Sequence, residues 1–188
     1  MASIKLTGDT SGEITISAPA VAGTNTLTLP AATGTLTTTD VATNTPIFSA
    51  YMSADTTGSD NTVTKVEFDS VEIDTNSAFD TSLYRFTVPS GGSGKYQVNA
   101  CVRVATGVSA NLVQTYLSLH KNGSAFRVEY DNYSSNYLRD MSKQLSVVVD
   151  LSDGDYLEIY AFGNTQNSGN FTVTSGVYSN FSAYKLIG

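Results

Sequence analysis

Apolar and polar residues alternate along most of this chain, which is the two-residue period of a β-strand. The segment KYQVNACVRV places one set of apolar residues on a single side, namely Tyr96, Val98, Ala100, Val102 and Val104. QTYLSLHKNG ends in Asn122-Gly123, a pair typical of a tight hairpin turn, and AFRVEY follows it. No segment has a helical period. About eight alternating segments after residue 46 predict an all-β, antiparallel sandwich.

The first 45 residues carry a weaker version of the same pattern. Short alternations occur at Ile4/Leu6, Ile14/Ile16 and Leu27/Leu29, and the motif Pro-Ala-x-x-Gly-Thr appears twice, at 19–24 and 30–35. This region contains no aromatic residue, and the first aromatic residue of the chain is Phe48. Strands with one thin apolar face cannot form a core by themselves. They need a partner surface.

We therefore expect two regions, with a boundary where turn-forming residues cluster before Pro46. Residues 1–45 are expected to form an extended N-terminal β-arm that anchors the chain through Ile14, Ile16, Leu27 and Leu29. Residues 46–188 are expected to form the sandwich domain. A flexible Thr/Ala-rich linker is the alternative interpretation of the first region.

Some strands of the second region are apolar on both faces. NFSAYKLIG places Phe181, Ala183 and Ile187 on one side and Tyr184 and Leu186 on the other, and in LSVVVDL Val148 faces away from its apolar neighbours. A strand that is apolar on both faces is expected to be covered on both. We therefore expect a symmetric homo-oligomer with Val148, Phe181, Tyr184 and Leu186 at the subunit interface. Coverage by loops of the same chain is the alternative.

Composition narrows the choice of partners. The chain has 17 acidic and 10 basic residues, a net charge of -7, which argues against binding to nucleic acid or to an anionic membrane surface. No apolar run approaches the roughly 20 residues that a membrane span needs, and MASIKLTGDTSG lacks the pattern of an export signal. We expect synthesis in the cytoplasm without export or membrane insertion. The single cysteine, Cys101, excludes an intrachain disulfide.

The second region also contains a recognisable series of segments. They are, in order, IFSAYMS, TKVEFDSVEIDTNSAFD, YRFTVPSGGSGKYQVNA, LHKNG, SVVVDLSDGDYLEIYA and NFSAYKLI. Together they resemble the complement/tumour-necrosis-factor family of jelly-roll domains over residues 46–188. The resemblance implies a ten-stranded antiparallel jelly roll that assembles as a compact homotrimer. It assigns these residues to positions that maintain the fold: Phe79, Phe86, Pro89, Gly94, Tyr96, Gly154, Asp155 and Phe181.

The first region resembles a different group of proteins. GDTSGEITISAPAVAGTNTLTLPAATGTL is similar to short segments of bacteriophage structural proteins, especially tail-fibre and related appendage proteins, where they precede a trimeric knob. The sequence has neither a collagen-like Gly-x-y repeat nor a heptad coiled coil, so it departs from the pattern of a long shaft. The resemblance implies that the repeat-containing segment anchors the domain that follows.

Residues suited to catalysis or metal binding are few. His120 has no Ser or Cys motif beside it, and Cys101 has only Arg103 as a basic neighbour, so we expect interface or structural roles for both. The acidic clusters Asp69/Glu72/Asp74 and Asp150/Asp153/Asp155 fit turns, with calcium as the functional alternative. We expect no enzymatic activity and no cofactor.

One segment has the composition of a recognition loop. YDNYSSNYLRD mixes rings and adaptable hydrogen-bonding groups, which suit sugars as well as proteins. The candidate residues are Tyr130, Asn132, Tyr133, Asn136 and Tyr137. A solvated or intersubunit loop is the alternative.

These features favour a structural protein of a phage particle. The leading hypothesis is a homotrimeric surface knob on a short tail fibre or appendage, docked on another virion protein by its N-terminal arm and facing a glycan or protein of the host surface. A capsid decoration protein, with the arm clamping shell subunits, is the close alternative. A free secreted trimer and a glycan-cleaving tailspike are the remaining interpretations.

Overall fold

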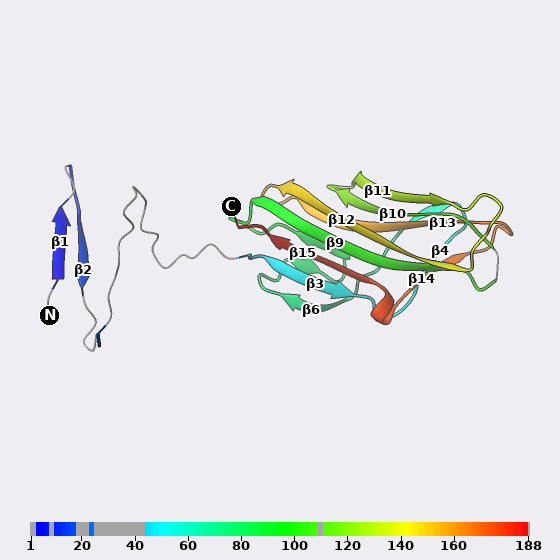
Figure 1. Cartoon of the computed structure of the whole chain (residues 1–188), viewed down its shortest axis with the longest axis horizontal. Helices are drawn as coiled ribbons and strands as arrows, with labels where there is room; N and C mark the ends of the chain where they lie inside the picture. Colours follow the sequence, from blue (N-terminus) through cyan, green and yellow to red (C-terminus); the bar gives the residue numbers. More distant parts are fainter. Residues whose placement is uncertain (1–2, 8–9, 18–22, 25–43, 109–110, 188) are drawn as a thin grey trace. The chain divides into compact units, whose positions relative to one another are not determined.

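The computed structural model of the chain describes residues 3–7, 10–17, 23–24, 44–108 and 111–187. The chain divides into two compact units, Met1–Val41 and Ala42–Gly188, and each is described by itself (Figure 1). This division lies within a few residues of the boundary that the composition indicates. The second unit is called the C-terminal domain below.

The described part of the first unit is a β-hairpin. Strands β1 (Ser3–Thr7) and β2 (Glu13–Ser17) are antiparallel, with Ile4 opposite Ile16 and Leu6 opposite Ile14. Gly12 has φ +83°, a conformation that glycine adopts without steric cost. The prediction of a single extended arm is therefore wrong for residues 3–17, because the two alternating segments pair with each other. Leu27 and Leu29 lie outside the described residues.

The C-terminal domain consists of two antiparallel sheets, as expected for an all-β sandwich (Figure 1). The β9 sheet contains, in spatial order, β4 (Thr56–Gly58), β14 (Phe171–Thr174), β9 (Gly94–Ala105), β15 (Asn180–Lys185), β3 (Ile47–Tyr51) and β6 (Ser70–Asp74), with β12 (Asp140–Leu151) also paired to β9.

The β13 sheet contains β11 (Ser124–Asn132), β10 (Leu112–Lys121), β13 (Tyr156–Thr165), β8 (Arg85–Thr87) and β7 (Phe79–Asp80), with β5 (Thr62–Lys65) also paired to β13. A short 3-10 turn, Gly176–Tyr178, precedes β15. The described part of the domain thus has thirteen strands, β3 to β15, rather than ten, because the chain between residues 56 and 87 forms five short strands.

The inward faces of the two sheets form one hydrophobic core. All five apolar residues that the alternation placed on one side of β9 are buried. At one end, the ring of Phe48 stacks on Phe79 and Phe86, with centroids 5.0 and 4.8 Å away, and meets Phe181 edge-on at 4.8 Å. Phe181 is fully buried among these rings. Its assignment to a subunit interface is therefore wrong, because it has no surface to offer a second chain.

The turn at Asp153-Gly154 links the two sheets rather than two neighbours in one sheet. Strand β12 pairs with β9, whereas β13 pairs with β10, so the chain crosses from one layer to the other at this turn. The Asp153 carboxylate accepts hydrogen bonds from the backbone N–H groups of Gly91 and Ser93, at 2.7 and 2.8 Å. This turn is thereby tied to the loop that leads into β9.

Close packing between the sheets depends on two glycines that enclose one ring. Phe171 is fully buried between Gly58 of the β9 sheet and Gly163 of the β13 sheet. A Cβ atom on Gly163 would lie 2.7 Å from Cγ of Phe171, and a Cβ atom on Gly58 would collide with the far edge of the same ring. Neither position has room for a side chain.

We predict that Gly163→Ala lowers the free energy of unfolding by about 2 kcal/mol, because overpacking forces the buried ring from its position. Gly107→Ala is the matched control, since a Cβ there meets nothing within 4 Å, and it should change stability by less than about 0.5 kcal/mol. Urea denaturation of both variants measures the difference. Equal midpoints would contradict this account of the packing.

Candidate functional site

Rows of side chains cross the outer face of the β13 sheet. The register places Tyr116 opposite Phe162, Ser118 opposite Tyr160 and His120 opposite Glu158. The rings of Tyr116 and Phe162 are parallel within 2° and 4.6 Å apart, and His120 stacks on Tyr160 at 4.1 Å. Such cross-strand pairs stabilise a sheet. The rings also cover the small Ser118, which is buried although it lies on an outer face.

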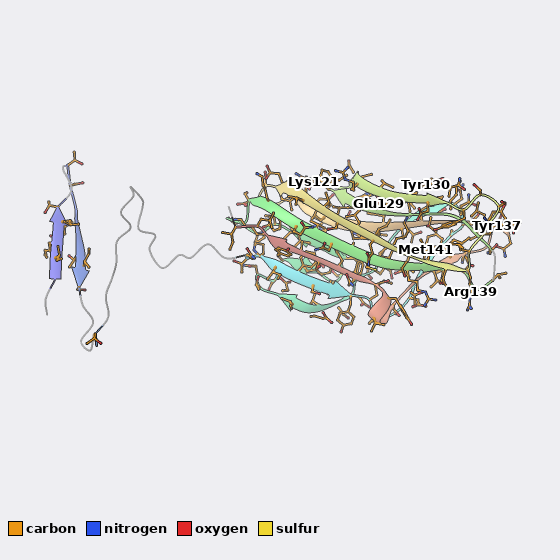
Figure 2. All side chains as sticks on the ribbon, in the orientation of Figure 1. Lys121, Glu129, Tyr130, Tyr137, Arg139 and Met141 are labelled. Carbon is orange, nitrogen blue, oxygen red and sulfur yellow. The ribbon has the colours of Figure 1, made fainter. Side chains whose placement is uncertain are left out.

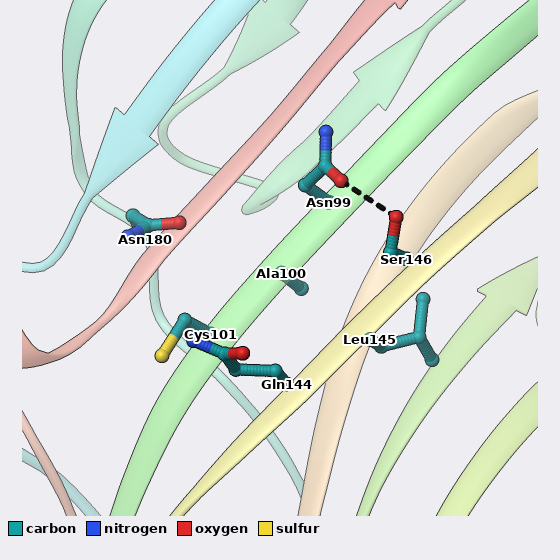
Figure 3. Close-up of a pocket in the computed structure, with 7 residues that line it drawn as sticks. All are labelled: Asn99, Ala100, Cys101, Gln144, Leu145, Ser146 and Asn180. Atoms are coloured by element: carbon teal, nitrogen blue, oxygen red, sulfur yellow. Dashed lines mark hydrogen bonds between the residues drawn. The ribbon is translucent and has the colours of Figure 1, made fainter.

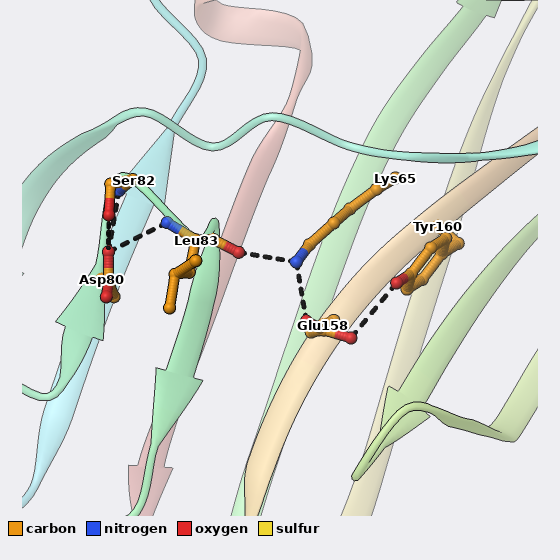
Figure 4. Close-up of polar contacts among 6 residues, drawn as sticks. All are labelled: Lys65, Asp80, Ser82, Leu83, Glu158 and Tyr160. Atoms are coloured by element: carbon orange, nitrogen blue, oxygen red, sulfur yellow. Dashed lines mark hydrogen bonds and ion pairs between the residues drawn. The ribbon is translucent and has the colours of Figure 1, made fainter.

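A buried ion pair lies beside these rings. Nζ of Lys65 is 2.6 Å from Oε1 of Glu158 and also donates a 2.6 Å hydrogen bond to the carbonyl of Leu83, while the Tyr160 hydroxyl donates to Oε2 of Glu158 at 3.2 Å (Figure 4). The Glu158 side chain is only 8% exposed. The pair joins β5, β13 and the turn before β8 into one polar network. This network has no local signal in the sequence because its two charged residues are 93 positions apart.

The turn that supplies the Leu83 carbonyl is itself shaped by a carboxylate. Asp80 accepts hydrogen bonds from the backbone N–H groups of Ser82 and Leu83, at 2.8 and 2.9 Å, and from the Ser82 hydroxyl (Figure 4). The Ser82 hydroxyl, followed by the Leu83 N–H, lowers the pKa of Asp80. The carboxylate is therefore ionised at neutral pH and acts as a turn-forming group.

The same face brings together a serine, a histidine and a carboxylate without forming a catalytic triad. Oγ of Ser118 and Nδ1 of His120 are both buried and have no hydrogen-bond partner, and Glu158 is bound to Lys65 and Tyr160 instead of His120. A hydrolase of the Ser-His-acid type needs a serine that is hydrogen-bonded to its histidine and reachable by substrate. Desolvation lowers the pKa of His120, which keeps it neutral in the folded protein.

The five residues of the proposed recognition loop lie partly on a strand and partly in the segment that follows it. Tyr130 and Asn132 belong to β11, and Figure 2 shows Tyr137 at the end of the sandwich. The hydroxyls of Tyr133 and Thr115 are hydrogen-bonded at 2.7 Å, and the Tyr133 ring packs against the core. Tyr133 therefore contributes to packing with part of its surface, and its role in a recognition loop stays a prediction.

Two hydrogen bonds, one to the Asn132 side chain and one between backbone groups, hold the turns of this segment. Oδ1 of Asn132 accepts the backbone N–H of Ser134 at 2.9 Å, and the backbone N–H of Asn136 donates to the Tyr133 carbonyl at 2.8 Å. Tyr130 stays exposed on the outer side of β11, close to Val128 and Phe126, which are exposed as well. The exposed apolar residues nearest to this segment thus lie on strand β11, and residues 133–139 form the loop that follows it.

Strand β11 forms one edge of the β13 sheet. Among the described strands it pairs with β10 alone, and every residue of it except Asp131 is classed as exposed. Asp131 forms an ion pair with the buried Lys143 of β12. Edge strands that combine free backbone groups with apolar side chains are ready-made contact surfaces.

The outer face of the β9 sheet carries the other predicted contact residues. Val148 on β12 is 50% exposed, and Tyr184 and Leu186 at the end of the chain are half-buried. The register places Val148 and Tyr184 on either side of Gln97 of β9. A shallow hollow of about 240 Å³ lies further along the same strands, lined by Asn99, Ala100, Cys101, Gln144, Leu145, Ser146 and Asn180 (Figure 3). Its lining contains no acidic or basic side chain. The hydroxyl of Ser146 donates to Oδ1 of Asn99 at 2.9 Å.

The acidic clusters are used in hydrogen bonds to the protein. Asp155 accepts the backbone N–H of Ser152 and the amide of Asn122 and pairs with Lys121, and these contacts lower its pKa to about 2. Asp74 accepts the backbone N–H groups of Ala78 and Phe79, at 2.9 Å each. In the described part of the chain no group of three or more His, Cys, Asp or Glu side chains could hold a metal ion. The calcium prediction therefore has no ligand set there.

We predict that Lys65→Met lowers the free energy of unfolding by about 3 kcal/mol, because it leaves the Glu158 carboxylate buried without a counter-ion. Lys95→Met is the matched control. Its partner Asp150 lies 4.0 Å away and both side chains are largely exposed, so the expected change is less than about 0.5 kcal/mol. Chemical denaturation of the two variants compares them, and an equal loss in both would refute a structural role for the buried pair.

Comparisons with known proteins agree with this architecture. The family model of the C1q domain matches residues 47–186. The globular domain of zebrafish complement 1qA protein superimposes with a TM-score of 0.52 and 16% identity, over 76% of this chain and 98% of that one. Eiger TNF from S. frugiperda gives 0.53 and 13%, over 75% and 90%, and murine APRIL gives 0.52 and 15%, over 74% and 98%.

No curated protein matches the chain, and in its described part no helix is long and apolar enough to cross a membrane. The identities with solved structures support the fold alone, whereas the family match covers most of the chain. It also begins and ends where the sandwich does, with β3 and just after β15. The chain therefore belongs to the C1q domain family through residues 47–186.

Proposed function

We propose that this protein is a non-enzymatic, homotrimeric structural protein of a phage particle, in which the C1q domain is a surface knob and residues 1–45 attach it to another virion protein. The leading form of the proposal is a short tail fibre or appendage that takes part in host adsorption. The observation that carries it is the separate hairpin unit ahead of the C1q domain.

Two exposed surfaces of the C1q domain support the trimer. C1q/TNF homologues form homotrimers, and this domain has the apolar edge strand β11 on one sheet and the face around Val148, Tyr184 and Leu186 on the other. Covering both would bury side chains that a monomer leaves in water. A closed ring of copies joins two different surfaces of each neighbour, which fits a trimer better than a two-fold dimer.

The outer faces also support a role in contact rather than catalysis. C1q/TNF-like domains are generally structural or ligand-binding. In this chain the histidine has no bonded nucleophile, and the buried carboxylate is held by Lys65. A glycan or protein of the host is the partner we propose for the knob, with Tyr137 of the segment after β11 as the candidate aromatic contact.

A capsid decoration protein is the second candidate. The sequence contains no Gly-x-y or heptad repeat that would form a long shaft between the N-terminal segment and the domain. A trimer held close to the shell by three short segments would clamp neighbouring shell subunits. Both candidates place the protein on the virion surface, and they differ in how many copies each particle needs.

The interface prediction can be tested with two valines. Val148→Lys should convert the trimer to monomers, because an unpaired ammonium group would enter an apolar contact. Val63 is the matched control, since it is 45% exposed on β5 of the other sheet, and Val63→Lys should leave the trimer intact. Light scattering on size-exclusion fractions gives the mass of each. A trimeric V148K protein would remove this residue from the interface.

The virion role is tested by the number of copies of this chain relative to the major shell protein in purified particles, measured by quantitative mass spectrometry. A small fraction supports a tail appendage, and a ratio of the same order supports a decoration protein. Deletion of residues 1–45 should leave a trimeric domain that no longer incorporates into particles. Absence of the full-length chain from particles would overturn the proposal.

A further inference from the structure

The β1–β2 hairpin is a small sheet with one apolar face. Ile4, Leu6 and Ile16 are 64%, 54% and 47% exposed, and the register places Ile4 directly opposite Ile16. Lys5, which lies between Ile4 and Leu6 and therefore points to the other side, forms a 2.9 Å ion pair with Glu13. One face is thus hydrophobic and exposed to solvent. The other face is polar, and its two charged side chains pair with each other.

A two-stranded sheet of this kind is marginal in water and gains stability when its apolar face is covered. The charges on the hairpin indicate what can cover it. Lys5 and Glu13 form an ion pair with each other. With Asp9 between the two strands, residues 3–17 have one positive and two negative side chains, a net charge of -1. Copies of the hairpin therefore repel one another much less than the net charge of -7 would make whole chains do.

We infer that the hairpins of the three copies of this chain pack their apolar faces against one another, with Ile4, Leu6 and Ile16 at the contact. The inference rests on the trimer of the proposed function. Within a trimer, the residues between Ser17 and Ile47 can span at most about 100 Å, at roughly 3.3 Å each. Confinement to that distance gives each hairpin an effective concentration on the order of 1 mM for the other two.

This contact assigns a different task to part of the N-terminal segment. Ile16 becomes a residue of a small shared core, in which three identical sheets meet face to face around one axis. The polar faces with the Lys5–Glu13 pair then point outward. These polar outer faces and other residues of segment 1–45 then bind the particle.

Adjacent residues on opposite faces of β2 provide a matched test. In the full-length Cys101→Ser protein, Ile16→Cys places a thiol on the apolar face and Thr15→Cys places one on the polar face. A short bis-maleimide reagent bridges thiols at about the 10 Å spacing of packed sheets. The I16C protein should give a covalent dimer on a denaturing gel, with at most about two of the three chains of a trimer linked. The T15C protein should stay at least tenfold less linked.

Light scattering on the same samples separates this inference from the proposed function. If the proteins are trimeric and I16C is linked no more than T15C, the hairpins do not meet through their apolar faces and the inference fails while the trimer stands. If the proteins are monomeric, the trimer and the inference both fail. Linkage of I16C alone in a trimeric protein supports both.

Discussion

Strand β9 is the element on which the rest of the C1q domain depends. It pairs with β12 along its whole length on one side, and with β15 and β14 on the other. Its alternating side chains fill the centre of the core. Burial of five apolar residues on one strand stabilises the fold only because both edges of that strand are hydrogen-bonded, so that no backbone group is left without a partner in the interior. The outward-facing residues of β9 are left free to serve a surface role.

The two sheets use their outer faces differently. On the β13 sheet, stacked rings and the Lys65–Glu158 ion pair lie across the outer face. The polar atoms of Ser118 and His120 that resemble catalytic groups are buried, and the Glu158 carboxylate is held by Lys65. On the β9 sheet, amides, hydroxyls and a few apolar residues surround a shallow hollow, and the Lys95–Asp150 and Arg103–Asp140 pairs lie elsewhere on the same two strands. The uncharged part of this face can be covered by another protein surface at little electrostatic cost. The outer face of the β9 sheet is therefore better suited to protein contacts than that of the β13 sheet.

Local pattern was enough to predict the strands but not their partners. Alternation identified the buried side of β9, and Asn122-Gly123 identified the β10–β11 hairpin. The Asp153-Gly154 turn has similar chemistry but links two sheets, because pairing is decided by distant strands. Likewise, alternation separates Phe181 from Tyr184 without saying which side faces inward. The contact of Phe181 with Phe48, far away in the sequence, decides that question. Polar composition suggested a loop at 130–137, but pairing with β10 extends β11 to Asn132.

The chain enters and leaves the C1q domain at the same place. Ile47 is opposite Tyr184 in the pairing of β3 with β15, and the backbone N–H of Lys185 donates to the Pro46 carbonyl at 3.1 Å (Figure 1). A pull on the N-terminal segment would therefore act along β3, which is held between β15 and β6. Force along a strand loads the flanking backbone hydrogen bonds together rather than one after another. The attachment point thus lies on a strand whose two neighbours share the load.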